Sequence, residues 1–291
     1  MIHVGTSGYV YDHWRPVFYP KGLPGRRWLE HYSRIFPTVE LNATFYRLPT
    51  ASTVDGWREG TPAGFRFAAK GSRYLTHMKR LKDPGPGIER YFDLILRLGK
   101  KLSVVLWQLP PQMSRADPDR LARFLERLPK DGLRHAVEFR SPSWYSAEVC
   151  DVLDAWGAAF CEHDLVRLRP PRVTGGFRYL RFHGATGKYR GRYGKRALRP
   201  FAQDLMTWSG DSYVYFDNDQ FGHAIRDALD LSDLVGKPLH CGDAVRDPRR
   251  SRPLAVESTG PDRHRDAGAP PPRAARGAGE AEREPGAALR R

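Results

Sequence analysis

A strand-length segment of alternating apolar and polar residues recurs along this chain, and it constrains the fold more than any other feature. Successive side chains of a β-strand point to opposite faces, so each copy places apolar residues on one face and polar residues on the other. Helix-length stretches separate the copies. This predicts a parallel sheet with helices over its apolar face and its polar face around an enclosed centre. The clearest copies are Val39-Glu40-Leu41-Asn42, Val137-Glu138-Phe139-Arg140, Leu180-Arg181-Phe182-His183 and Val214-Tyr215-Phe216-Asp217.

Apolar alternation and β-rich composition predict eight strands. Eight strand-and-helix repeats in about 240 residues match the size of a single (βα)8, TIM-barrel-like domain. A doubly wound open sheet is the structural alternative. The predicted strands are 2–6, 38–42, 65–70, 102–108, 134–139, 158–163, 178–183 and 212–217. The predicted helical stretches are 26–36, 87–99, 118–128, 146–156, 198–209 and 223–231.

The composition of the chain changes near residue 245. Residues 1–245 are predicted to form the α/β barrel domain, whereas residues 246–291 are rich in Arg, Pro, Gly and Ala and contain almost no large apolar residues. Such a segment cannot bury enough apolar surface to order itself, so we expect a disordered C-terminal tail. The tail holds 11 Arg against 7 acidic residues, which leaves +11 of the formal charge of +15 on the barrel domain.

Several classes of protein are disfavoured by the composition. No run of about 18 apolar residues is present to span a bilayer, and residues 1–5 resemble a first strand rather than a signal peptide. We therefore expect a cytoplasmic protein with no membrane partner. Three cysteines without CxxC spacing argue against disulfides and a structural zinc site. Walker-A and GxGxxG motifs are absent from the sequence, and we expect no cofactor and no bound metal.

Polar residues occupy the inward positions at the C-terminal ends of nearly all predicted strands, where barrel enzymes have their active sites. Burying such charges is costly unless they are paired, so the ring is a salt-bridge network, a functional site, or both. We favour function because barrel interiors are usually filled by branched apolar residues. The candidates for acid/base catalysis are Glu40, Glu138 and His183. The predicted substrate-binding residues are Ser7, Asn42, Lys70, Gln108, Arg140, Trp144, Arg181, Tyr193, Asp217 and Asn218.

These roles have alternatives. Glu40 and Glu138 can instead neutralise neighbouring cations, and His183 can bond to a neighbouring strand. Lys70 is suited either to bind an anion or to form a Schiff base, and the anion role is preferred because nothing in the sequence indicates a depressed pKa. A metal site has no close-spaced motif, and the adjacent Arg140 and Arg181 would repel a cation. The suitable ligand types are supplied by Glu40, Glu138, His163, Asp164, His183 and Asp217.

A basic loop follows the seventh predicted strand, with five cations and two tyrosines between residues 188 and 196. Loops after strands 7 and 8 of barrels often bind phosphate. The leading hypothesis is therefore an enzyme that acts by acid/base chemistry on a small anionic substrate, phosphorylated or sugar-like, at the mouth of the barrel. The alternative is a nucleic-acid-binding protein that uses this loop and the arginine-rich tail, because Tyr and Arg planes can stack on bases. Such binding would be largely non-specific.

A set of ordered motifs runs through the chain. They are Gly5-Thr6-Ser7-Gly8-Tyr9 with Trp14 and Phe18-Tyr19-Pro20, residues 39–47, Phe67-Ala68-Ala69-Lys70, Gln108-Leu109-Pro110-Pro111, Glu138-Phe139-Arg140 with Ser143-Trp144, and Tyr179-x-Arg181-x-His183-Gly184. They resemble the YecE-like family, known as domain of unknown function 72, over roughly residues 2–240. The resemblance implies a TIM-barrel-like fold and no particular activity. This chain departs from the family pattern at Phe216-Asp217-Asn218, where the family has Phe-Asn-Asn, and at 161–165, which lacks an acidic residue followed by proline.

Overall fold

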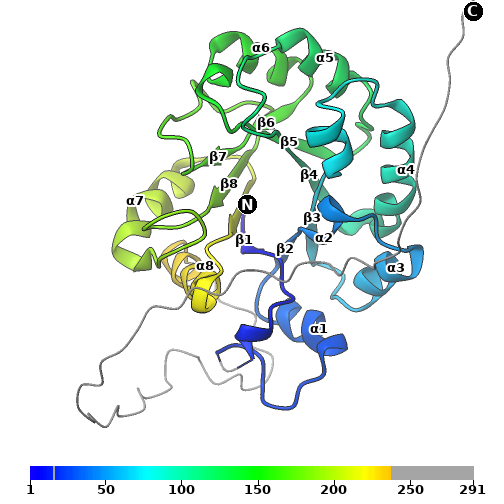
Figure 1. Ribbon diagram of the computed structural model, residues 1–291. Coiled ribbons are helices and arrows are strands. Elements are labelled where there is room, and N and C mark those ends of the chain that lie inside the picture. Colours follow the sequence, from blue (N-terminus) through cyan, green and yellow to red (C-terminus); the bar gives the residue numbers. More distant parts are fainter. Residues whose placement is uncertain (16, 237–291) are drawn as a thin grey trace, which may run out of the picture. The chain divides into compact units, whose positions relative to one another are not determined.

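The strands of this protein form one parallel sheet that curves into a nearly closed barrel (Figure 1). The computed structural model describes residues 1–15 and 17–236. The predicted α/β barrel is confirmed, whereas the predicted tail and the boundary at residue 245 lie outside the described residues. The strands are β1 (Ile2–Ser7), β2 (Thr38–Leu41), β3 (Arg66–Lys70), β4 (Leu102–Gln108), β5 (Arg134–Glu138), β6 (Ala158–Phe160), β7 (Glu162–His163), β8 (Arg178–Phe182) and β9 (Ser212–Phe216).

The two shortest strands form the edges of the sheet, and the curved sheet nearly closes between them. Its order is β6-β5-β4-β3-β2-β1-β9-β8-β7, so β6 and β7 form the two edges. Only Cys161 separates them along the chain, and its N–H still donates to the carbonyl of Val137 in β5 at 2.8 Å. The strand predicted over 158–163 is therefore one segment that pairs first with β5 and then with β8. For this reason the eight predicted strands are found as nine.

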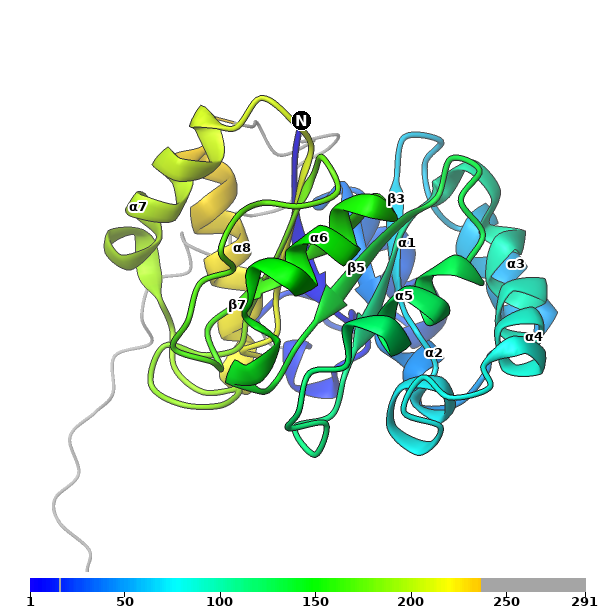
Figure 2. The ribbon, with the colours of Figure 1, turned by 90° about the horizontal axis from the view of Figure 1, so that it is seen from above.

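Helices cover the outside of the barrel in both views (Figures 1 and 2). Each of the six predicted helical stretches contains a helix, and the predicted cap at Asp117 is present, since its carboxylate accepts from the N–H of Arg120 at 2.9 Å. Helix α3 was not predicted, because Val54 and Trp57 are its only buried residues and give no clear periodicity. The α-helices are α1 (Trp28–Ser33), α2 (Ala43–Tyr46), α3 (Ala51–Glu59), α4 (Gly85–Ile95), α5 (Pro118–Glu126), α6 (Ala147–Ala155), α7 (Gly194–Thr207) and α8 (His223–Leu234).

Apolar side chains form two separate layers. The larger layer packs between the strands and the helices and includes Leu41, Phe139 and Phe182, which the alternation predicts to point outward. The inner layer fills the lower part of the barrel with small side chains and aromatic rings, among them Ala68, Tyr179 and Tyr215. The inward register then continues to polar residues at the C-terminal ends of the strands. The interior of the barrel is therefore polar at the C-terminal ends of the strands and apolar beneath them.

Candidate functional site

Arg181 of β8 is the centre of the polar network at the mouth. Its guanidinium lies 2.7 Å from the carboxylates of Glu40 and Glu138 and 2.9 Å from that of Asp217. These acids come from β2, β5 and the segment after β9, so the Arg181 side chain forms ion pairs with three separate parts of the barrel. Burial opposes the charge of Arg181, but the three carboxylates outweigh it and hold its pKa well above the usual range.

Glu40 and Glu138 are fully buried and ionised. Glu40 accepts hydrogen bonds from Ser7 and, at 2.6 Å, from the hydroxyl of Tyr179. Glu138 pairs with Arg140 as well as with Arg181. Burial alone would raise the pKa of both carboxyl groups, yet Arg181 for Glu40, and Arg140 and then Arg181 for Glu138, lower the pKa values instead. Carboxylates held in this way are suited to keep the arginines in place and poorly suited to donate a proton.

His183 is enclosed by the same network. Its Nε2 lies 3.0 Å from Nη1 of Arg181 and 3.2 Å from Nη2 of Arg140, and its Nδ1 lies 3.2 Å from Asp164. A guanidinium can only donate, so Nε2 accepts and the ring hydrogen sits on Nδ1, where it donates to Asp164. The hydroxyl of Tyr193 donates to the same carboxylate. Both ring nitrogens are thus occupied, and His183 positions Arg140 and Arg181.

Four further predicted residues divide into two groups. Ser7 and Asn42 lie beside Arg181, since the Asn42 amide donates to Ser7 Oγ at 2.9 Å and Arg181 Nη2 donates to that oxygen at 3.0 Å. Asn218 and Trp144 lie elsewhere. Asn218 donates to Asp227 at 2.8 Å and to the carbonyl of Gly191, and Trp144 stacks on Phe139 in the outer core. Their positions favour structural roles over substrate contact.

A cavity of about 390 Å³ opens at the mouth, beside this network. Its lining includes three cationic side chains, an amide, an imidazole and three aromatic rings, and no carboxylate. Lys70 and Gln108 are the predicted residues that reach it together with Arg140. The lining residues are Phe45, Tyr46, Lys70, His77, Gln108, Pro111, Arg140, Leu165, Lys188 and Tyr189.

Five residues of this cavity were not assigned a role from the sequence: Phe45, Tyr46, His77, Pro111 and Leu165. Phe45 belongs to α2 and His77 to a π-helical turn (Tyr74–Met78), and neither short element has a readable period. Tyr189 lies in the basic loop, whose mixture of tyrosines and cations was a signal for binding. Lys188 and Tyr189 bring that loop to the cavity, as the loop hypothesis requires.

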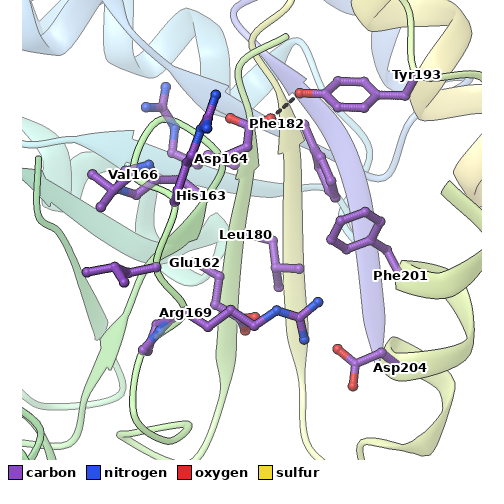
Figure 3. A pocket seen from close by; sticks show the side chains of 14 residues that line it. Glu162, His163, Asp164, Val166, Arg169, Leu180, Phe182, Tyr193, Phe201 and Asp204 are labelled. Atoms are coloured by element: carbon purple, nitrogen blue, oxygen red, sulfur yellow. Dashed lines mark hydrogen bonds between the residues drawn. The ribbon is translucent and has the colours of Figure 1, made fainter. Parts of the chain in front are cut away.

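A second cavity, of about 360 Å³, lies outside the barrel wall between β8 and α7 (Figure 3). It exists because the connection over residues 164–177 contains no helix to cover β8. Leu180, Phe182 and Phe201 supply apolar walls. The acidic groups there are already engaged, because Glu162 and Asp204 both pair with Arg178. The mouth cavity, whose cations face an acid-free lining, is therefore the better candidate for a ligand site.

Two further observations concern the part of the chain that the structure describes. No group of three or more His, Cys, Asp or Glu side chains among these residues is placed to hold a metal ion. None of the helices between residues 1 and 236 has the length and apolar character needed to cross a membrane. The expectation of no metal and no cofactor stays a prediction.

Comparison with protein families and known proteins gives consistent matches. The family described as "Protein of unknown function DUF72" matches residues 3–251. The chain is similar to the UPF0759 protein YunF of Bacillus subtilis (strain 168), with 26% identity over 275 residues, which covers 81% of this chain and 95% of that protein. It is also similar to the UPF0759 protein YecE of Escherichia coli (strain K12), with 28% identity over 146 residues, or 50% of this chain and 51% of that protein.

Solved structures show the same barrel. A DUF72 family protein from Thermotoga maritima MSB8 superposes with a TM-score of 0.71 at 29% identity, covering 81% of this chain and 99% of that one. A DUF72 family protein from Enterococcus faecalis V583 superposes with a TM-score of 0.67 at 18% identity, covering 82% and 96%. The second match supports the fold alone, because its identity is low.

Proposed function

Given that this chain belongs to the DUF72 family, whose description assigns no reaction, we propose that it is an enzyme for a small anionic, phosphorylated or sugar-like substrate. The observation that carries the proposal is the cationic lining of the mouth cavity. Lys70, Arg140 and Lys188 reach it from β3, the end of β5 and the basic loop. Cationic side chains that converge on a space without acids attract and orient an anion.

The charges beneath the cavity support this assignment. Glu40 and Asp217 are paired with Arg181, and Glu138 is shared between Arg181 and Arg140. These acids are therefore engaged in the network, and neither Lys70 nor Lys188 forms an ion pair with a described residue. The volume of the cavity lies within the range of small-molecule sites. Phe45, Tyr46 and Tyr189 add aromatic surface against which a sugar ring or another flat group can pack.

The acid/base roles of Glu40, Glu138 and His183 stay a prediction, and the role of the two carboxylates is limited to accepting a proton. The two carboxylates are ionised, so they can accept a proton but cannot supply one. Within the cavity itself, the imidazole of His77 is a further hydrogen-bonding group of the lining. Glu40 and Glu138 are therefore retained as proton acceptors, and His77 is added to the candidate site residues because it lines the cavity.

The nucleic-acid alternative is less well supported by the basic loop. Arg192 pairs with Asp230 at 2.6 Å and Lys195 with Asp233 at 3.2 Å, so two of its five cations are already neutralised by α8. Lys188 reaches the mouth cavity instead. Association with a nucleic acid through the remaining charge is expected to fall steeply with salt, because it would depend on counterion release.

Lys188→Gln is expected to weaken binding of an anionic ligand by roughly tenfold, the contribution of one charged hydrogen bond. The measurement is calorimetric titration with inorganic phosphate and glucose 6-phosphate, with unphosphorylated glucose as the ligand control. Lys195→Gln is the matched variant, because it removes the same charge from the same loop outside the cavity. Equal weakening by both variants would show non-specific attraction and favour the nucleic-acid alternative. No binding of either phosphate ligand to the unmodified protein would count against the proposed function.

A further inference from the structure

Lys70 is the one buried cation of the mouth cavity that lacks a carboxylate partner among the described residues. Only 8% of its surface is exposed, and its Nζ lies 4.5 Å from the ring centroid of Phe45. Arg140 and Arg181, by contrast, each contact Glu138 directly. An amine that is desolvated, accessible from a cavity and free of an ion pair has the environment of a nucleophilic lysine.

The electrostatics of the site agree with this geometry. Burial disfavours the charged amine, and Arg181 adds to the effect, so the pKa of Lys70 falls to about 8 even though Glu138 and Glu40 oppose the shift. At pH 7 the Lys70 amine is then neutral in roughly a tenth of the molecules. For an ordinary lysine this fraction is less than about one in a thousand. Only the neutral amine can attack a carbonyl carbon.

We propose that Lys70 is a catalytic nucleophile that forms an imine with an anionic aldehyde or ketone. This rests on the proposed function and narrows the substrate to carbonyl compounds whose anionic group is held by Arg140 and Lys188. The amine nitrogen bonds to the carbonyl carbon, and the carbon–oxygen bond then breaks. The two protons that the Lys70 ammonium loses leave with that oxygen as water, so a protonated carbon–nitrogen double bond remains and the net charge is unchanged.

His77 supplies a hydrogen-bonding group beside this chemistry. It lines the same cavity, and its ring meets that of Phe45 edge-on at a centroid distance of 5.0 Å. Burial and then the charge of Lys70 lower the pKa of His77 to about 4, so the imidazole is neutral at physiological pH. Its Nδ1 contacts Thr76 Oγ1 at 2.9 Å, whereas its Nε2 bonds to none of the residues described. That nitrogen is available to accept a hydrogen bond from the Lys70 ammonium or from the departing water.

The test is imine trapping with pyridoxal 5′-phosphate as an anionic aldehyde probe. The full chain is incubated with the probe and then with borohydride, which delivers hydride to the imine carbon and fixes the adduct, and the modified residue is located by peptide mass spectrometry. We expect Lys70 to be modified at least tenfold more than any other lysine. Pyridoxal, which lacks the phosphate, should give far less adduct. Lys70→Arg should abolish the preferred site, and Lys195→Arg, which changes a lysine outside the cavity, should retain it.

Two controls separate the possible failures. Pyridoxine 5′-phosphate carries the phosphate without the aldehyde, so its binding reports on the anion site alone. If it binds while Lys70 is not trapped in the unmodified protein, imine formation is refuted and the proposed function stands. If neither phosphate compound binds, both proposals fail. Adduct spread evenly over exposed lysines also overturns the assignment, and this outcome can be read from the unmodified protein even if Lys70→Arg does not fold.

Discussion

Arg181→Met is expected to lower the free energy of unfolding by roughly 3 to 5 kcal/mol at neutral pH. The substitution leaves Glu40 without its only ion pair among the described residues and takes one of two arginines from Glu138. Both carboxylates stay buried, so they lose the partner that compensated their desolvation. Methionine replaces much of the arginine volume, which keeps the cavity contribution small. Urea unfolding followed by circular dichroism measures the loss.

Arg172→Met provides the matched control for this change. Arg172 also bridges two carboxylates, those of Asp151 and Asp154, but its side chain is 42% exposed. A surface arrangement of this kind is screened by solvent and contributes little to stability. If Arg181→Met cost no more than Arg172→Met, the network at the mouth would not be a structural element of the barrel.

The acid sensitivity of the protein follows from the same carboxylates. The folded state holds the pKa values of Glu40 and Glu138 below the ordinary value of 4.5. A depressed pKa stabilises the fold fully above the unfolded value, and the contribution is lost as the pH falls through the folded value. We therefore expect the unmodified protein to lose stability below about pH 4.5, in proportion to the protons taken up on unfolding.

In Arg181→Met, burial dominates at Glu40 and raises its pKa, so acidification from pH 7 to pH 5 should narrow the stability gap between variant and unmodified protein. Unfolding curves at the two pH values measure the gap. A gap that stays constant would show that Glu40 is not left ionised and unpaired.

Local alternation was sufficient to predict the barrel and its inward register. The period of two along each strand places Glu40 inside and Leu41 outside, and this alternation depends only on the local sequence. The break at Cys161 was not predictable in the same way. It arises because the segment leaves β5 and joins β8, and this exchange of partners depends on how the whole sheet closes.

The candidate site was predictable only where it is built on strands. Lys70, Glu138 and Arg181 converge because the ends of parallel strands meet at one edge of the sheet. Trp144 follows β5 in a short 3-10 helix (Pro142–Trp144), where no period says whether an aromatic ring turns toward the mouth or toward the core. The lowered pKa of Lys70 also had no sequence signal, because it depends on burial and on Arg181, which lies far away along the chain.

Gly184→Ala is expected to reduce binding of anionic ligands at the mouth by at least about tenfold while the barrel still folds. Gly184 adopts a φ of +147°, and a Cβ atom there would lie 2.1 Å from the carbonyl oxygen of Gly187 and 2.4 Å from that of Arg190. The loop carrying Lys188 and Tyr189 is folded back onto this glycine, so an added methyl group must displace it from the cavity.

Gly187→Ala tests whether this displacement, rather than any alanine in the loop, causes the loss. Gly187 has a similar φ of +156°, but a Cβ atom there would meet nothing within 4 Å, so only backbone strain is added. Phosphate titration of both variants, together with their unfolding free energies, separates the two effects. We expect Gly184→Ala to lose binding with a stability cost of about 1 to 3 kcal/mol, and Gly187→Ala to retain most of the binding. Retained binding in Gly184→Ala would remove the loop from the ligand site, because the structure allows no position for the new methyl group while Lys188 stays at the cavity.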